Sequence, residues 1–190
     1  MTNVLLSGVG GQGTILASDI LCSVFHEVGY DVKKSEVHGM AQRGGDVTTH
    51  FRFGKKVYSP LIKYGDVDFL ISFELLEGLS YINWVKKSGK ILLNQQETLP
   101  TAVTRGTMKY PEDVVKTFKK HFKKNVYVID GLDIAMRCGD ARAVNIVTLG
   151  AFSNFFDIKE EVWEKNLLEH LPEKVHQLNL NAFREGKKVI

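Results

Sequence analysis

The sequence predicts an α/β fold, a three-layer, Rossmann-like mixed sheet with a β-hairpin insertion and C-terminal helices. Short apolar runs typical of buried strands recur through the first two thirds of the chain, and helix-periodic segments separate most of them. A stretch of alternating apolar and polar residues interrupts that order, as a half-buried strand would. The 190 residues fit one domain over 1–190, with the helices at about 158–186 as an appendage.

The first unit is a strand, a glycine-rich turn and a helix. Residues 3–7 form an apolar run that glycines end, and residues 14–28 repeat apolar side chains at a helical period. Gly29 stands where a helix C-terminal cap is expected. This order predicts a buried central strand that leads through residues 8–13 into an amphipathic helix.

A hairpin is expected in the next part of the chain. Residues 30–37 are typical of a second strand, and a polar, glycine-containing stretch follows over 35–45. Apolar and polar residues then alternate over 47–53, and a turn follows. We expect 57–59 to pair back on that strand at a sheet edge, because Pro60 comes next, and we therefore expect a mixed sheet.

The remaining elements return to alternation of strands and helices. In chain order we expect a strand over 67–72, a helix over 73–84, a strand over 90–94, a helix over 111–122 and a strand over 125–130. Residues 95–110 have weak periodicity and contain Pro100 and Gly106, so they are expected to form an excursion with one short strand near 102–104.

From Leu132 onward the pattern is almost wholly helical. Residues 143–156 are more hydrophobic than a surface helix needs, so this helix is either central in the fold or docked on another chain. Further helices are expected over 158–171, with Asp157 as a possible N-cap, and from Pro172 onward.

The composition argues against a nucleic-acid-binding protein, a protein with a four-cysteine cluster and a membrane-spanning protein. The formal net charge of +3 comes mainly from lysines that are more typical of solvated helix faces than of a nucleic-acid site, since no aromatic residues are interleaved with them. Two separated cysteines, Cys22 and Cys138, cannot supply a four-ligand cluster and suit a reducing compartment. No apolar run approaches the length of about 18 residues that a membrane span needs, so a cytoplasmic location is expected.

The glycine-rich turn matches the pattern GxGxxG in a strand-to-helix context. Its members are Gly8, Gly10, Gly11, Gln12 and Gly13, with Val9 between the first two. Such glycines let the backbone approach a pyrophosphate at a helix N-terminus. A dinucleotide site also expects an acidic residue about 20 positions later, whereas Glu36 follows Gly8 by 28. The alternative is a tight turn against a neighbouring surface, and both interpretations remain open.

The stretch over 35–45 concentrates groups that could carry chemistry. Arg43 could clamp a phosphate or carboxylate, and Gln42 offers an amide beside it. Glu36 and His38, which alternation places on one side of an extended chain, are candidate catalytic residues or a structural hydrogen-bonding pair.

The glycines of the same stretch have a different role from its charged groups. Gly39, Gly44 and Gly45 allow close backbone approach, which suits a ligand loop or a subunit contact. Only two good metal ligands lie close together here, so no metal site is expected.

Acidic residues follow two other strands. Glu74 and Glu77 come after one strand end and Asp130 after another, at the binding edge of an open α/β sheet. Helix capping and the helix dipole explain these positions better than catalysis does. The sequence contains no P-loop, nucleophile elbow, HExxH or CxxC motif.

Three segments carry a resemblance to a known family. Gly-Val-Gly-Gly-Gln-Gly at 8–13, Ser-Glu-Val-His-Gly-Met-Ala-Gln-Arg-Gly-Gly at 35–45 and Tyr-Ser-Pro-Leu-Ile at 58–62 resemble the small subunits of the 2-oxoacid:ferredoxin oxidoreductases. The resemblance is closest to the beta subunits of indolepyruvate ferredoxin oxidoreductases and covers nearly the whole chain, as the gamma-type domain of that superfamily. The run from Glu36 to Gly45 is its specific part, because related subunits for other oxoacids carry a different sequence before the shared Arg-Gly-Gly.

The resemblance implies a subunit of an enzyme that decarboxylates aryl pyruvates such as indolepyruvate to acyl-CoA and CO2 and reduces ferredoxin. It implies that thiamine diphosphate and [4Fe-4S] clusters bind to a large (alpha) subunit, and that coenzyme A is a co-substrate. This chain alone is then expected to bind no cofactor and to be inactive. Its partners would be the large subunit and, through the hetero-oligomeric complex, ferredoxin, with no nucleic acid or membrane.

Within that resemblance, residues 8–13 and Gln42 to Gly45 would form ligand or subunit-interface loops, and the catalytic residues stay undefined beyond the candidates His38 and Glu36. Two other functions remain open from the residues alone. One is a stand-alone nucleotide-binding protein that uses the glycine-rich turn, and the other is a non-catalytic assembly module.

Overall fold

The structure of the chain is a computed structural model that describes residues 1–38 and 45–190, without the side chain of His38. The predicted site residues Gly39, Gln42, Arg43 and Gly44 lie outside the described residues.

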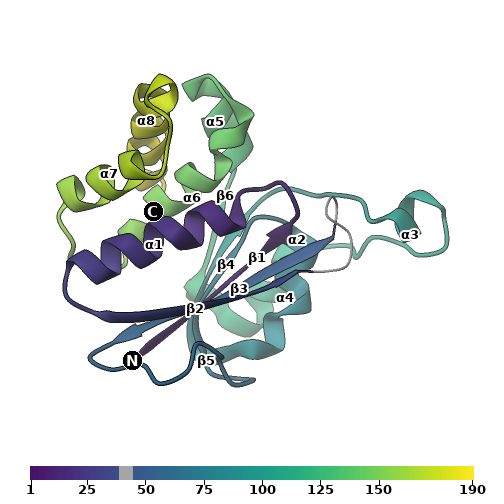
Figure 1. Cartoon of the computed structure of the whole chain (residues 1–190). Coiled ribbons are helices and arrows are strands. Elements are labelled where there is room, and N and C mark those ends of the chain that lie inside the picture. The colour runs from purple at the N-terminus through teal and green to yellow at the C-terminus, as the bar shows by residue number, and fades with distance from the viewer. Residues whose placement is uncertain (39–44) are drawn as a thin grey trace.

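The described strands form one mixed sheet in the order β2-β3-β1-β4-β5-β6 (Figure 1). Strand β3 runs antiparallel to both of its neighbours, β1 and β2, whereas β1, β4, β5 and β6 run parallel to one another. The bounds are β1 (Thr2–Val9), β2 (Asp31–His38), β3 (Asp46–Gly54), β4 (Val67–Ser72), β5 (Val85–Asn94) and β6 (Val126–Ile129). The predicted mixed α/β sheet is confirmed.

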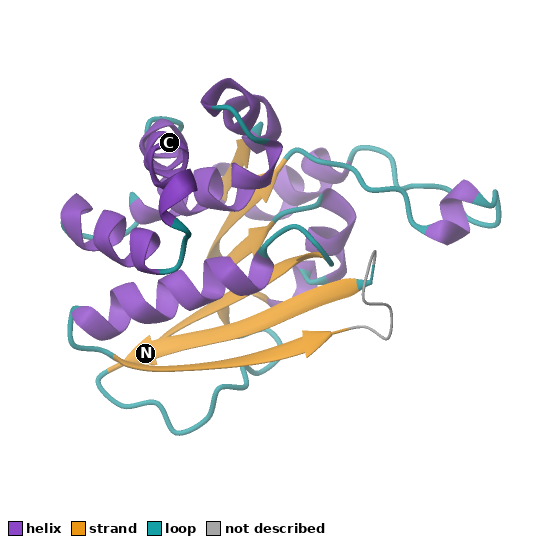
Figure 2. Cartoon of the chain, turned by 45° about the horizontal axis from the view of Figure 1, so that its top comes forward, coloured by secondary structure: helices purple, strands orange, loops and turns teal. Residues whose placement is uncertain are grey.

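Helices cover both faces of the sheet. Side chains alternate along β1, so Val4 and Leu6 pack with one set of helices while Leu5 packs with the other. The first set is α1 (Thr14–Glu27), α5 (Gly131–Cys138), α6 (Val144–Ser153), α7 (Glu160–Glu169) and α8 (His176–Lys187). The second set is α2 (Leu75–Ser80) and α4 (Val114–Phe122). Three layers result, and Figure 2 shows helices on both sides of the strands.

Helix α6 is central in the fold, because each of its residues is buried. It crosses α8 at close range through two glycines. A Cβ atom on Gly150 would lie 2.0 Å from the Phe183 carbonyl oxygen, and one on Gly186 would lie 2.0 Å from the Val147 carbonyl oxygen. Only glycine fits at either position, so the hydrophobic run over 143–156 is explained by packing within the chain.

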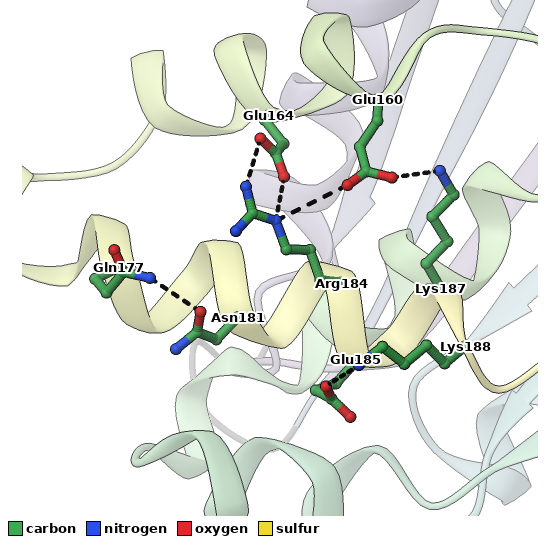
Figure 3. A network of polar contacts seen from close by, with 8 residues as sticks. All are labelled: Glu160, Glu164, Gln177, Asn181, Arg184, Glu185, Lys187 and Lys188. Atoms are coloured by element: carbon green, nitrogen blue, oxygen red, sulfur yellow. Dashed lines mark hydrogen bonds and ion pairs between the residues drawn. The ribbon is translucent and has the colours of Figure 1, made fainter.

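Charged side chains hold α7 against α8 on the outer surface (Figure 3). Arg184 donates from Nε to Glu164 at 2.6 Å, and Lys187 donates to Glu160 at 2.6 Å. Glu160 also lies 3.8 Å from Arg184 Nε. These pairs are partly exposed, so they position the two helices more than they stabilise the chain.

The predicted hairpin arm over 57–59 is wrong. Strand β3 already has β1 and β2 on its two sides, so it offers no free edge, and the hairpin is formed by β2 and β3. Buried Val57 and Ile62 instead anchor an irregular loop. Arg52 fixes that loop by donating from Nη1 to the carbonyl oxygens of Ser59 and Leu61, each at 2.8 Å.

Three other local predictions are also wrong. The excursion contains a short helix, α3 (Thr101–Thr104), in place of a strand, because that segment leaves the sheet and has no edge to pair with. The helix after β4 ends at Ser80 and is followed by a 3-10 turn, η1 (Ile82–Trp84). Helix α7 is preceded by Lys159 at its N-cap position, so Asp157 does not cap it.

In the part of the chain that the structure describes, every helix is too short or too polar to span a membrane.

Candidate functional site

One edge of the sheet gathers most of the predicted site residues. Strands β1, β2, β4, β5 and β6 run in the same direction, so the segments that follow them meet at this edge, which we call the C-terminal edge. After β1 the chain enters α1 on one face, and after β4 it enters α2 on the other face. Ligands of open α/β sheets bind at such a switch point, between neighbouring strands whose connections diverge.

The glycine-rich turn contacts the end of the polar stretch at this edge. The Gly10 amide donates a hydrogen bond of 2.9 Å to the Gly45 carbonyl oxygen. Gly45 directly precedes β3, whose Asp46 pairs with Val9 of β1. Two segments that the sequence separates by more than 30 residues therefore form one surface.

Gln12 shapes the turn from inside. Its side-chain oxygen accepts a hydrogen bond of 2.7 Å from the Val9 amide, and its nitrogen lies 3.4 Å from the Phe73 carbonyl oxygen. A Cβ atom on Gly8 would lie 2.8 Å from that same Gln12 oxygen. Gly8 thus leaves room for the Gln12 side chain, and the side-chain amide of Gln12 holds the turn against Val9 and Phe73.

A hollow of about 500 Å³ adjoins the turn. It is lined by Val9, Gly10, Gly11, Gly13, Thr14, Ile15, Leu16, Asp19 and Val47. The Thr14 hydroxyl is buried and has no hydrogen-bond partner among the described residues. It begins the first turn of α1, where backbone amides are also left without intrahelical partners. Both features suit an anionic group at this helix end.

Gly13 closes the turn in a left-handed conformation, with φ of 77°. Asn145 of α6 donates to its carbonyl oxygen at 3.3 Å, and a Cβ on Gly13 would lie 2.4 Å from that donor nitrogen. The position therefore requires glycine for its dihedral angle and for the close approach of α6.

Glu36 is engaged by a lysine within its own strand. Lys34 Nζ lies 2.5 Å from Glu36 Oε1 and also contacts Asp19 of α1. Burial alone would lower the pKa of Lys34, but its hydrogen bonds to Asp19 and Glu36 raise that pKa above the usual value. The carboxylate of Glu36 thus helps to dock α1 on β2, and the predicted pairing of Glu36 with His38 stays a prediction because the His38 side chain is outside the described part.

Cys22 lies on the same side of α1 as this ion cluster. Burial raises the pKa of its thiol to about 11, although the Lys34 ammonium opposes the shift. The thiol is therefore protonated near neutral pH and is a poor nucleophile.

Glu74, which follows β4, accepts hydrogen bonds from three residues. The sequence predicts only one of these, the cap of α2. Glu74 caps α2, as predicted, by accepting a hydrogen bond of 2.7 Å from the Glu77 amide. Its other carboxylate oxygen accepts from the Thr98 amide at 3.0 Å and from the Tyr110 hydroxyl at 2.6 Å. Burial and that bond to Glu74 raise the pKa of Tyr110 above its usual value, so the hydroxyl remains a donor.

Glu77 is partly buried near two other carboxylates at the same edge. Burial, together with the carboxylates of Glu74 and Asp46, raises the pKa of Glu77 to about 7. Glu77 is therefore partly protonated near neutral pH.

Asn94, which the sequence interpretation missed, links three connections. Its side chain donates to the Phe73 carbonyl oxygen at 3.0 Å and accepts from the Gly131 amide at 2.9 Å. Its only sequence signal is a polar residue that ends an apolar strand. Asp130 accepts from the Asp133 amide at 3.0 Å, so the predicted helix N-cap is confirmed.

A second hollow, of about 590 Å³, lies between α5, α7 and α8. Its lining includes Cys138 and most of the charged residues of Figure 3, which form ion pairs on α7 and α8. The described residues that line it belong to none of the family-like segments, so we take the C-terminal edge as the candidate site. Among the described residues, no three His, Cys, Asp or Glu side chains are placed to hold a metal ion.

Comparisons with known proteins identify the family of the chain. The family model described as pyruvate ferredoxin/flavodoxin oxidoreductase matches residues 3–189. Indolepyruvate oxidoreductase subunit IorB from Thermococcus kodakarensis is 35% identical over 190 residues, covering 98% of this chain and 94% of that protein.

Two solved structures share the fold. The gamma subunit of a keto/oxoacid ferredoxin oxidoreductase from Geobacter sulfurreducens superposes with a TM-score of 0.73 at 23% identity, covering 99% of this chain and 97% of that chain. The 2-oxoglutarate:ferredoxin oxidoreductase from Magnetococcus marinus, solved with 2-oxoglutarate, coenzyme A and succinyl-CoA, gives a TM-score of 0.75 at 20% identity. There the match covers 99% of this chain but 30% of the longer chain.

The resemblance to indolepyruvate oxidoreductase small subunits is therefore confirmed over nearly the full length. The chain belongs to the pyruvate ferredoxin/flavodoxin oxidoreductase family and is homologous to the IorB and gamma-type subunits of its ferredoxin-dependent enzymes.

Proposed function

We propose that this chain is the non-cluster subunit of a ferredoxin-dependent oxidoreductase that converts aryl pyruvates, such as indolepyruvate, to acyl-CoA and CO2. The observation that carries the proposal is the Gly10 to Gly45 hydrogen bond, which joins two family-like segments into one surface at the C-terminal edge. The chain supplies that surface, and a larger subunit completes the active site against it.

Exposed apolar side chains at the same edge support a partner there. Ile15 is 39% exposed at the start of α1, Val37 is 53% exposed near the end of β2, and Leu132 is 41% exposed at the start of α5. These side chains come from three elements that begin or end at this edge. Such a grouping is typical of a surface that another protein covers.

The redox cofactors belong to the partner in this proposal. Cys22 and Cys138 are both free and lie on different helices, and the described residues offer no other cluster ligands. The described residues of this chain do not fit a [4Fe-4S] cluster. We therefore assign thiamine diphosphate and the clusters to the large subunit, with ferredoxin as acceptor. The free thiols are consistent with a cytoplasmic complex.

The glycine-rich turn suits the phosphate groups of coenzyme A. The α1 N-terminus, the glycine backbone and the unpartnered Thr14 hydroxyl all favour an anion beside the hollow. Asp19 also lines the hollow, but its carboxylate is paired with Lys34. In this role the chain binds and orients the acyl acceptor while the partner carries the redox chemistry.

A stand-alone nucleotide-binding function is the second candidate, because the same hollow could hold NAD or FAD without a partner. Calorimetry with the isolated chain separates the two functions. Micromolar affinity for a dinucleotide would favour the second candidate. Coenzyme A binding only in the co-expressed complex would favour the first.

The substrate preference of the complex tests the assignment of aryl pyruvates as its substrates. The co-expressed complex should reduce ferredoxin with indolepyruvate and coenzyme A at a kcat/KM at least about tenfold above that for pyruvate or 2-oxoglutarate. A preference for either smaller oxoacid would contradict the aryl pyruvate assignment while leaving the family membership intact.

A further inference from the structure

Residues 97–109 form an arm that reaches away from the rest of the chain. Figures 1 and 2 show α3 at its tip, beyond the C-terminal edge of the sheet and apart from the other helices. Most of these residues are exposed. Among the described residues, neither hydrophobic core includes any side chain between 95 and 109. Packing within this chain therefore does not explain the arm.

The base of the arm is fixed firmly. One oxygen of the buried Glu74 carboxylate accepts from Thr98 where the arm leaves and from Tyr110 where it returns. The Gln95 amide adds a hydrogen bond of 2.8 Å to the Ile129 carbonyl oxygen. A buried carboxylate with three hydrogen bonds is costly to move, so the direction of the arm is set by the body of the protein.

The tip folds on itself and leaves apolar groups outside. The amides of Thr107 and Met108 both donate to the Ala102 carbonyl oxygen, at 2.9 and 3.1 Å. The side chains of Leu99 and Met108 are nevertheless 53% and 65% exposed. A locally ordered tip with exposed Leu and Met side chains is suited to packing on another protein.

From these contacts we infer that the arm over 97–109 packs on the large subunit and holds it against the C-terminal edge. The inference rests on the proposed function. We assign the large subunit as the partner because the arm leaves from the same edge of the sheet as the glycine-rich turn and the exposed apolar side chains Ile15 and Leu132, where we propose that the large subunit binds. Tyr110 and Glu74 act as positioning residues for the arm and touch no reacting atom.

The test uses the co-expressed complex and measures its dissociation constant by dilution, with mass photometry as the readout. The variant Leu99→Asp with Met108→Asp places charges on the arm without disturbing buried groups. The matched control is Leu61→Asp with Tyr64→Asp, whose side chains are 58% and 67% exposed at the opposite end of the sheet. The arm variant should raise the dissociation constant at least about tenfold, and the control should change it less than about threefold.

A second variant tests the arm without adding the negative charges of the two Asp substitutions. Tyr110→Phe removes a hydroxyl that donates to Glu74, so the arm should loosen and the dissociation constant of the complex should rise about threefold to tenfold. A wild-type dissociation constant in the arm variant, or an equal loss in the control, would overturn the inference alone. A wild-type chain that forms no complex would overturn the proposed function and the inference with it.

Discussion

The Gly10 amide donates a hydrogen bond of 2.9 Å to the carbonyl oxygen of Gly45. This bond joins the turn after β1 to the residue before β3, and it makes one surface of two segments that the family resemblance singles out separately. The two segments lie at the switch point of the sheet, where open α/β folds bind ligands. The site therefore belongs to the fold as a whole and not to either segment alone.

Glu36→Gln should change stability more than catalysis. The substitution removes the negative charge that Glu36 pairs with Lys34 but leaves Lys34 bound to Asp19, so the free energy of unfolding should fall by about 0.5–1 kcal/mol. The kcat for ferredoxin reduction by the complex should stay within about threefold of wild type. Lys34→Met, which removes both ion pairs, is the control and should destabilise more. A hundredfold loss of kcat in Glu36→Gln with unchanged stability would instead give Glu36 a direct role in the chemistry.

Gly13→Ala should weaken both the fold and the binding of coenzyme A. The positive φ costs about 1–2 kcal/mol for alanine, and the new Cβ would displace Asn145 as well. Gly29→Ala is the control, since its φ is 90° and nothing lies within 4 Å of its Cβ position. Calorimetry on the complex should show about a tenfold weaker affinity for coenzyme A in Gly13→Ala only. Equal affinities of the two variants for coenzyme A would show that the glycine-rich turn is not part of the coenzyme A site.

Gly150→Ala and Gly186→Ala should each destabilise the chain strongly. Each new methyl group would lie 2.0 Å from a carbonyl oxygen of the facing helix, so α6 and α8 would have to separate. We expect a loss of at least about 3 kcal/mol, seen as a fall of roughly 6–12 °C in melting temperature by scanning calorimetry. Gly106→Ala, which meets nothing within 4 Å, should lower it by only a few degrees.

Glu77 should make stability depend on pH. Its pKa is raised to about 7 from the usual value of 4.5 by burial and by the Glu74 and Asp46 carboxylates. The folded state therefore binds more protons than the unfolded state between those values, so this group lowers stability as pH rises through the window. Glu77→Gln should be more stable than wild type at pH about 8, and the advantage should vanish at pH about 4. Urea unfolding at both pH values measures it, and an advantage that does not change with pH would contradict the raised pKa.

The central strands could be predicted because burial on both faces leaves a continuous apolar run. Residues 3–7 and 67–72 lie within β1 and β4 for this reason. The glycine-rich turn could also be predicted, since its glycines lie within six residues and two of them adopt positive φ. Gly29 also ends α1 as predicted, with φ of 90° and a hydrogen bond from its amide to the His26 carbonyl oxygen.

The two wrong strand predictions fail because a strand needs a free sheet edge. The site contacts were not predicted because they join residues that are far apart in the sequence. Residues 57–59 and 102–104 have local features of strands but no edge on which to pair. The Glu74 contact with Tyr110 joins residues that are 36 apart, and the Gly10 contact with Gly45 crosses a helix and a strand. No local pattern encodes such distances, so the sequence identified the glycines and acids of the edge without showing how they meet.

The rate of ferredoxin reduction with indolepyruvate and coenzyme A tests the central claim most directly. It should be measured for this chain alone, for the large subunit alone and for the co-expressed complex at equal concentrations. The account predicts activity in the complex, none in this chain alone, and at least about a hundredfold less in the large subunit alone. Full activity of the large subunit without this chain, or turnover by this chain alone, would contradict a shared active site at the C-terminal edge.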